Sequence, residues 1–377
     1  MAIHFNDKEF KDLLKTFSKL SSQCSNTHAP ISFDFEPFRM VMITEHAFIS
    51  ATPQTSIIPP VYPYTFNPEI LLNLTFTEGD VELFWENSTS ALCLKNNHLR
   101  TSLKVAVPTP EFDVVPSQID SIEIPLGFLI GIKKYLDIPF VFFTGNKELM
   151  PICFYRDDNG NLVVTADDGF SIARITTPIQ VPAKLKKLDI KVPKYIIDCL
   201  YSKGDLSDET TMRVGVNGFK SLFANKTIQI YSSSMNDETS SFEHAIDGFK
   251  PKVSCAFSPR KLSQGIKPLV GMIPKKDRPG TILSTKFTDK ISMSISHSDV
   301  GEGVMDFVDG ISDIYLENDL KNVTINMHPL AFQEYTNLMD VDTANMYADT
   351  RLVHYKGDCT MGGISATVEY IFPTVQV

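Results

Sequence analysis

One structural unit recurs six times along this chain of 377 residues. Each copy contains a short strand, a helix start, a helix with an apolar stripe, and then two or more strands. The six starts read FNDKEFKDLLKTF from Phe5, FNPEILLNL from Phe66, IPLGFLIGIKKYL from Ile124, KVPKYIIDCL from Lys191, FSPRKLSQGI from Phe257 and MHPLAFQEYTNLM from Met327. In five of them a proline fits the first helical position, where its missing N–H removes no hydrogen bond. The starts lie 57 to 70 residues apart, so six near-equal units of mixed helix and strand are predicted.

Breaks in the pattern group the six units into pairs. Prolines cluster before Ile122, and a polar joint containing Gly and Pro runs over 247–252. One unit alone cannot bury both its helix and its sheet face, but two units back to back can. The sequence therefore predicts an α+β fold of three similar domains, each of two helix-plus-sheet repeats. The predicted domains are 1–121, 122–247 and 248–377.

Composition narrows the class of protein. The formal net charge is −10, which argues against a protein coated with basic residues for nucleic acid but says nothing of local patches. The six cysteines are scattered, with no C-x-x-C pair, so neither a zinc site nor a redox motif is expected. The amino terminus lacks the pattern of a signal peptide, and no apolar run approaches the ~18 residues of a membrane span. We expect a cytoplasmic protein without a cofactor or a membrane segment.

The charge is distributed unevenly between the predicted helices and the rest of the chain. In the first helix Lys8, Lys11, Lys15 and Lys19 lie opposite an apolar stripe. Over the six predicted helices the net charge is +6, which leaves −16 for the strands and loops. A solvated helix surface would explain one such helix. Positive helices within an acidic chain are instead what a ring around a polyanion needs, because such helices attract phosphates without reading bases.

The stretch LVVTADDGFSIARI contains neighbouring carboxylates, Asp167 and Asp168. They could serve a metal or acid–base chemistry, or they could belong to a structural hairpin. Neighbours in a strand point to opposite faces, whereas a catalytic pair must converge on one atom, so the hairpin is favoured. The run 157–161 resembles a calcium loop but has its Gly too early and no closing Glu, and we interpret it as a hairpin turn. No catalytic residue and no metal site are predicted.

The whole chain resembles one known family, the bacterial-type sliding clamps that form the beta subunit of DNA polymerase III, here in a bacteriophage version. The resemblance is carried by VVTADDGFSIARITTP (163–178), VPKYIIDCLYSKGDLSDETTMRVGVNGFKSLFANKTIQIYSSS (192–234) and ATVEYIFPTVQV (366–377). It implies a head-to-tail homodimer of six similar lobes that encircles duplex DNA with its helices inside. It also implies a clamp loader, and a polymerase tethered through a short peptide motif, in the cytoplasm of the host cell for a viral protein.

The resemblance also implies site residues. The expected contacts with DNA are Lys8, Lys11, Lys15, Lys19, Lys133, Lys134, Lys194, Arg260, Lys261 and Lys267. The expected peptide cleft is Met150, Gly169, Phe170, Ser171, Ile172, Ile246, Phe372, Pro373, Thr374 and Val375. The expected dimer contacts are Met272 and Ile273. Where the family commonly has His-Arg, this chain has Phe170-Ser171, and its tail FPTVQV replaces a Met-Pro-Met-Arg-Leu type, so its preferred docking motif should differ.

Two other classes of protein remain open from the residues alone. A β-rich virion structural protein would also be acidic and built from repeats, but it has no need of lysines on helices and would not be retained on circular DNA. A metal-dependent phosphohydrolase would use Asp167 and Asp168, and a sensitive nuclease or phosphatase assay would detect it.

Overall fold

The computed structural model describes residues 2–22, 31–35, 38–43, 47–51, 64–66, 79–86, 91–97, 99–103, 120–138, 150–185, 188–201, 211–217, 220–224, 228–233, 242–307, 309–317 and 320–376. Its chain forms two compact units. The first contains residues 1–130 and 182–236, and the second contains 131–181 and 237–377. The division into three domains stays a prediction. Within the described residues, no helix is long and apolar enough to cross a membrane.

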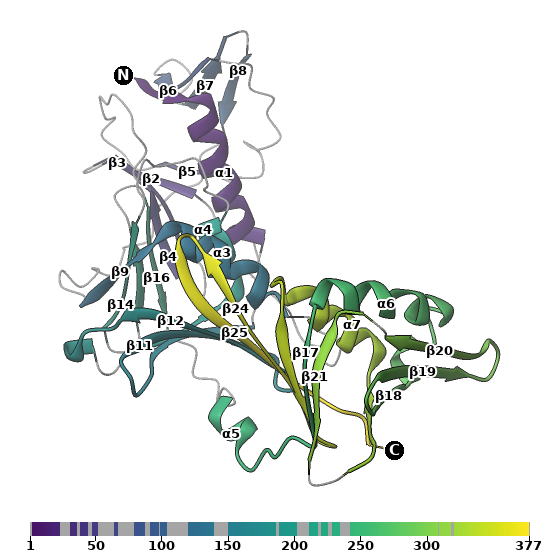
Figure 1. Ribbon diagram of the computed structural model, residues 1–377. Helices are drawn as coiled ribbons and strands as arrows, with labels where there is room; N and C mark the ends of the chain where they lie inside the picture. The colour runs from purple at the N-terminus through teal and green to yellow at the C-terminus, as the bar shows by residue number, and fades with distance from the viewer. Residues whose placement is uncertain are drawn as a thin grey trace. The chain divides into compact units, whose positions relative to one another are not determined.

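In its described residues, the first unit contains two antiparallel sheets together with helices (Figure 1). One sheet has the order β1 (Ala2–Asn6), β6 (Asp80–Glu86), β7 (Ala91–Asn96) and β8 (Leu99–Leu103). The other has the order β5 (Tyr64–Phe66), β2 (Ile31–Phe35), β3 (Phe38–Ile43), β4 (Ala47–Ala51), β16 (Ile228–Ser233), β15 (Lys220–Ala224), β14 (Thr211–Asn217) and β9 (Ser121–Pro125). The remaining elements are α1 (Asp7–Ser22), η2 (Ala183–Leu185), β13 (Asp189–Pro193) and α4 (Lys194–Tyr201), and α3 (Leu126–Leu136) begins here and ends in the second unit.

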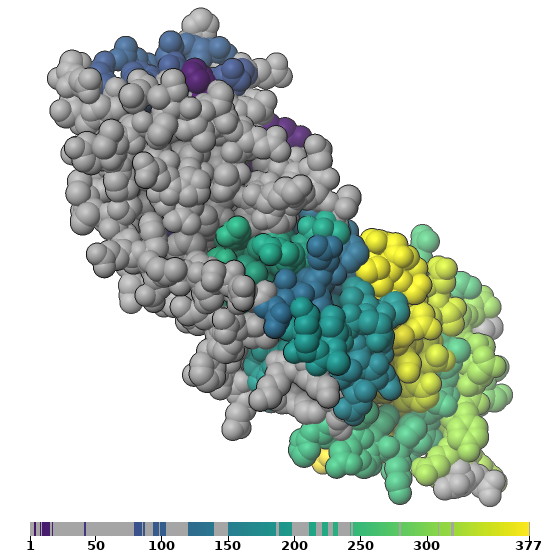
Figure 2. Space-filling model, turned by 90° about the vertical axis from the view of Figure 1, so that its left-hand side faces the viewer, coloured from purple at the N-terminus to yellow at the C-terminus, as the bar shows by residue number. Residues whose placement is uncertain are grey.

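The second unit also contains two antiparallel sheets. The long one includes, in order, β10 (Pro151–Arg156), β11 (Asn161–Asp167), β12 (Ile172–Gln180), β25 (Ile364–Pro373), β24 (Leu352–Met361), β23 (Ala344–Ala348), β17 (Val253–Phe257) and β21 (Ile311–Leu316). The short one has the order β20 (Gly301–Phe307), β19 (Ile291–His297), β18 (Leu283–Phe287) and β22 (Val323–Met327). The helical elements are α5 (Phe242–Ile246), α6 (Pro259–Met272), η3 (Arg278–Gly280) and α7 (Pro329–Leu338). Figure 2 shows the C-terminal residues, in yellow, at the surface beside blue-green residues from earlier in the chain.

Strand pairing links segments that are far apart in the sequence. In the first unit β4 pairs with β16, and Ile49 lies opposite Ile230. In the second unit β12 pairs with β25, and Ile172 lies opposite Ile371. Each pairing joins two strands that the sequence assigned to different domains. The pairing gives hydrogen-bond partners to backbone groups that would otherwise be exposed at the edge of a strand.

Two of the four described helix-start prolines lie at the predicted first helical position, and for the other two that position was wrong by one residue. Pro259 and Pro329 occupy the first helical positions of α6 and α7. Pro125 and Pro193 instead end the preceding strands, and α3 and α4 begin one residue later. The start at Pro68 lies outside the described residues.

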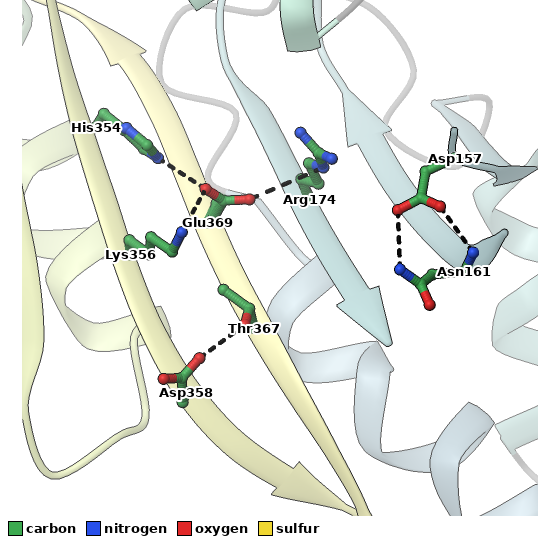
Figure 3. Close-up of polar contacts among 8 residues, drawn as sticks. All are labelled: Asp157, Asn161, Arg174, His354, Lys356, Asp358, Thr367 and Glu369. Atoms are coloured by element: carbon green, nitrogen blue, oxygen red, sulfur yellow. Dashed lines mark hydrogen bonds and ion pairs between the residues drawn. The ribbon is translucent and has the colours of Figure 1, made fainter. Parts of the chain in front are cut away.

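Both predicted hairpin turns are confirmed. β10 and β11 form one hairpin, in which the carboxylate of Asp157 accepts hydrogen bonds from the Asn161 backbone N–H at 2.7 Å and side-chain amide at 3.2 Å (Figure 3). Gly160 supplies the positive φ of +87° that this turn needs. β11 and β12 form the second hairpin through Asp168 and Gly169, and Gly169 has a φ of +83°.

We predict that replacing Gly265 will destabilise the second unit. A Cβ atom on Gly265 of α6 would lie 2.3 Å from Cε1 of Phe307 on β20, so Gly265→Ala forces this buried contact apart. The expected loss in the free energy of unfolding is about 1–3 kcal/mol, measured by urea denaturation. Gly271→Ala is the control in the same helix, because a Cβ atom there meets nothing within 4 Å. Equal stability of the two variants would contradict this account of the α6 packing.

Candidate functional site

One face of strands β12, β25 and β24 carries its side chains in rows. Alternate residues of a strand point to the same face, and residues opposite one another in the register lie side by side. The rows are Ile172–Ile371–His354 and, one step further along the strands, Arg174–Glu369–Lys356. We call the surface made by these six residues the β12–β24 face.

Glu369 is the buried centre of the charged row (Figure 3). Its carboxylate lies 3.2 Å from Nε2 of His354, 3.8 Å from Nε of Arg174 and 4.0 Å from Nζ of Lys356. Burial by itself would raise the pKa of Glu369, but the hydrogen bond with His354 and the nearby cations outweigh it, and the pKa is lowered. A carboxylate accepts only, so Nε2 of His354 carries the proton of that bond.

Helix α5 and the residues after it cover the apolar row. Phe242, Ile172, Leu352 and Ile371 form one buried cluster, on which Ala245, Ile246 and Phe249 pack. The guanidinium of Arg174 lies 4.6 Å from the centre of the Phe242 ring, a cation–π contact. The ring of His354 meets Phe242 edge-on at 5.8 Å and Phe249 at 6.4 Å. The β12–β24 face is therefore both apolar and cationic where α5 contacts it.

Helix α7 contacts the opposite face of β25. Phe372 stacks on Tyr335 of α7 with ring centres 4.5 Å apart and planes 3° from parallel. Tyr370, on the same side, contacts Tyr335 and donates a hydrogen bond to the carbonyl oxygen of Tyr135 at 3.1 Å. β25 thus separates an aromatic core under α7 from the surface covered by α5.

The paired carboxylates hold the turn between β11 and β12. Asp167 Oδ1 accepts from the Gly169 N–H at 2.7 Å, and Asp168 Oδ1 accepts from the N–H groups of Phe170 and Ser171 at 2.9 and 2.7 Å. Burial raises the pKa of Asp168, although these backbone hydrogen bonds oppose it. Within the described ranges, no three His, Cys, Asp or Glu side chains gather as a metal site would require. The geometry is that of a capped turn.

The structure divides the predicted cleft residues between two faces of β25. Ile172 and Ile246 pack in the α5 cluster. Phe372 points to the α7 side, and Ser171 lies there beside Tyr335. Sequence reasoning treated the tail as one wall, whereas successive residues of a strand alternate in direction. Which of these residues contact a peptide stays a prediction.

The other predicted cleft residues differ widely in exposure. Phe170, at the tip of the hairpin, is 59% exposed, whereas Met150 is buried. The tail beyond β25 is held by backbone hydrogen bonds, from the Thr374 N–H to the Arg351 carbonyl at 3.0 Å and from the Val375 N–H to the Asn326 carbonyl at 2.8 Å.

The predicted DNA contacts fall into groups by exposure. The exposed members are Lys8, Lys15, Lys134, Arg260, Lys261 and Lys267. Lys11 and Lys133 are half-buried, Lys194 is buried, and the side chain of Lys19 lies outside the described part. Lys134 forms an ion pair with Asp340, and Lys15 forms one with Asp12 at 3.5 Å. A buried ammonium is less accessible to a phosphate than an exposed one, and whether Lys194 contacts DNA stays a prediction.

The two predicted dimer residues at the end of α6 also differ. Met272 is 37% exposed, whereas Ile273 is buried. Met272 lies over β20, since a Cβ atom on Gly303 would be 2.7 Å from its sulfur. Of the two predicted dimer residues, Met272 is therefore the one whose side chain a second chain could contact.

The charged row of the β12–β24 face was missed in the sequence. Arg174 lies within a quoted motif and Glu369 within the closing strand, but neither was assigned a role. Polar and apolar residues alternate in 353–356, which predicts a strand with a polar face, but they do not alternate in 369–372, so the sequence gave no matching pattern around Glu369. Only the strand register shows that these residues meet.

Comparisons with known proteins identify the fold. No family model and no curated protein matches the sequence. The DNA polymerase III beta subunit of Thermotoga maritima superimposes with a TM-score of 0.79 at 14% identity, covering 100% of this chain and 99% of that one. The DNA polymerase sliding clamp of Bacillus subtilis gives 0.79 and the beta subunit of the Streptococcus pyogenes DNA polymerase gives 0.77, each at 13% identity over 100% of both chains. The chain therefore has the sliding clamp fold, as predicted from the sequence.

We predict that Glu369→Gln will lower stability at neutral pH. The neutral amide cannot pair with Arg174, His354 and Lys356, so the free energy of unfolding should fall by about 1–3 kcal/mol. Because the pKa of Glu369 is lowered in the folded chain, its stabilising effect is full above its ordinary pKa and disappears as the pH falls through the folded value. Urea denaturation of both proteins between pH 7 and pH 3 should show the difference shrinking. A difference that stays constant across this range would contradict the ion-pair assignment.

Proposed function

We propose that this chain is a DNA sliding clamp, a homodimeric ring that encircles duplex DNA and tethers a replicative polymerase. The observation that supports it most is the match to clamp structures over the full length of the chain. The proposal includes a clamp loader and a polymerase that dock through short peptides, and a bacteriophage protein acting in the cytoplasm of its host.

The charges of helix α6 support contact with DNA. Its apolar residues Leu262, Ile266 and Leu269 are buried, while Arg260, Lys261 and Lys267 are exposed. Such a helix presents cations from a fixed scaffold without groups arranged to read bases. Contacts of this kind hold phosphates weakly and at any sequence, which suits sliding.

Two strand edges support a head-to-tail dimer. In the sheets as described, β8 ends one sheet of the first unit and β20 ends the short sheet of the second. The outer surface of β20 carries Val304, which is 60% exposed, and Met272 lies beside the strand. An unpaired edge flanked by apolar side chains favours pairing with another chain. We propose that β20 of one chain meets β8 of its partner, and that two such contacts close the ring.

The metal-dependent phosphohydrolase has less support than the clamp. One carboxylate oxygen each of Asp167 and Asp168 accepts hydrogen bonds from the backbone N–H groups of their own turn. No observation favours a virion structural protein over the clamp.

The first prediction of the proposed function concerns contact with DNA. The triple variant Arg260→Glu, Lys261→Glu, Lys267→Glu should leave nicked circular DNA faster than the unaltered protein, because three phosphate contacts are lost. The slope of log affinity against log salt should fall by about one for each lost contact. The control is Lys290→Glu, an exposed lysine in a turn, which should change neither quantity. Unchanged retention of the triple variant would exclude α6 from the DNA contact.

The second prediction concerns the dimer. Met272→Glu places a charge in the proposed contact, so sedimentation should show the mass of one chain at concentrations where the unaltered protein has the mass of two. Tyr315→Glu changes an exposed side chain on β21, at the end of the other sheet, and should stay dimeric. Loss of the dimer in both variants, or in neither, would refute the assignment of this surface.

A further inference from the structure

The outer face of the short sheet in the second unit carries small polar side chains. Its strands β18, β19 and β22 bury alternate residues, so the residues between these point away from the core. The register sets Asn326 opposite Ser284, and Ser284 opposite Ser294, in one row across the three strands. Ser296 follows Ser294 two positions along β19 and lies on the same face. These amide and hydroxyl groups form a polar floor on the sheet.

The segment that joins α6 to β18 makes this floor one side of a cavity. Residues 276–282 supply the opposite wall, and the cavity has a volume of about 680 Å³, within the size range of small-molecule sites. Hydrogen bonds inside the segment hold the wall in place. The hydroxyl of Thr281 donates to the carbonyl oxygen of Asp277 at 2.9 Å, and the Gly280 N–H donates to the same oxygen at 3.2 Å.

His297 joins the wall to the end of β19. Its Nε2 lies 3.4 Å from Oδ2 of Asp277, and its Nδ1 accepts a hydrogen bond from the Asp299 N–H at 3.2 Å. A ring nitrogen that accepts carries no proton, so Nε2 of the neutral imidazole carries it and donates to Asp277. Both ring nitrogens are therefore used, and the imidazole is not available as a general base. Asp277 keeps its second carboxylate oxygen as an acceptor for a ligand.

The groups of the lining that keep hydrogen-bonding capacity are mainly donors. Within the part of the chain that the structure describes, the Lys276 ammonium has no ion-pair partner, and the hydroxyls of Ser294 and Ser296 have no hydrogen-bond partner. Oδ1 of Asn326 accepts from the Ser284 hydroxyl at 2.8 Å, which leaves both N–H groups of that amide. A cation together with amide and hydroxyl donors suits a phosphoryl group, whose charged oxygens accept hydrogen bonds.

The rest of the lining narrows the class of ligand further. The Asp277 carboxylate repels a bare phosphate ion but accepts a hydrogen bond from a hydroxyl group, so a ligand that fits carries hydroxyl groups as well as the phosphoryl group. Among the described residues, no Phe, Tyr or Trp lines the cavity, so a nucleobase finds no aromatic ring on which to stack. The lining is therefore suited to the sugar and the phosphoryl group of a ligand, and not to a base.

We propose that this cavity binds a small phosphorylated sugar. Lys276, the Asn326 amide and the serine hydroxyls hold the phosphoryl group, and Asp277 accepts a hydrogen bond from a hydroxyl group of the sugar. None of the lining residues is among those predicted to contact DNA, a partner peptide or a second chain. The site is therefore separate from the surfaces of the proposed clamp function and adds a small-molecule ligand to them.

The experiment titrates ribose 5-phosphate into the protein in a phosphate-free buffer, with isothermal titration calorimetry as the readout. Lys276→Ala is compared with Lys275→Ala, which removes a neighbouring exposed lysine that does not line the cavity. We expect Lys276→Ala to bind about tenfold more weakly, because a charge-assisted hydrogen bond is lost, and Lys275→Ala to bind like the unaltered protein. Equal affinities of the two variants would overturn the proposal, and so would an unaltered protein that fails to bind ribose 5-phosphate at millimolar concentrations.

A second pair of variants tests the floor of the cavity. Ser294→Ala removes a lining hydroxyl, whereas Ser292→Ala removes one that lies on the same face of β19 but outside the cavity. Only Ser294→Ala should weaken binding, by about fivefold for one neutral hydrogen bond.

Two further ligands test the chemistry of the site. Ribose and inorganic phosphate each carry only part of the groups of ribose 5-phosphate, so each should bind about tenfold more weakly than the whole ligand. Inorganic phosphate that binds as tightly as ribose 5-phosphate would overturn the assignment of a sugar, and ribose that does so would overturn the assignment of the phosphoryl group.

Discussion

The pairing of β12 with β25 is the constraint on which the described second unit depends. It sets residues 172–176 against 367–371, segments separated by most of the second half of the chain. This register places Arg174 beside Glu369, and Ile172 beside Ile371. A shift by one residue would turn each of these side chains to the other face, which would put the charged row into the aromatic core under α7 and expose the apolar row.

The two faces of β25 carry different kinds of contact. On one side Phe372 and Tyr335 form a packed aromatic core, whose role is to hold α7 in place. On the other side, Arg174, Glu369 and Lys356 form the charged row, next to the row that contains His354. Burying a carboxylate is costly unless nearby groups compensate it, and here Arg174 and Lys356 lie near Glu369 while His354 is in hydrogen-bond contact with it.

The sequence predicted the repeat, the helix starts and the hairpins because these depend on local chemistry. Proline before a helix and Asp-Gly between strands act through neighbouring residues, and the structure confirms Pro259 and Pro329 at helix starts and Asp168-Gly169 in a hairpin turn. The clamp fold was predicted from the resemblance of these units to a known family. The site was harder to predict, because it depends on which strands pair and in which register. Phe372 and Ile172 are both apolar and near the same joint, yet they lie on opposite faces. The role of Phe242 could not be read from its neighbours, since its partners come from β12, β24 and β25.

The central claim is that two chains close around duplex DNA, and a topological test addresses it most directly. The protein is loaded on a nicked circle, the nick is sealed, and the two chains are joined at both contacts by a bifunctional cross-linking reagent. The account predicts that the cross-linked protein stays with the circle through complete denaturation and is released when a nuclease linearises the DNA. Separation of protein from the intact circle on denaturation would contradict it.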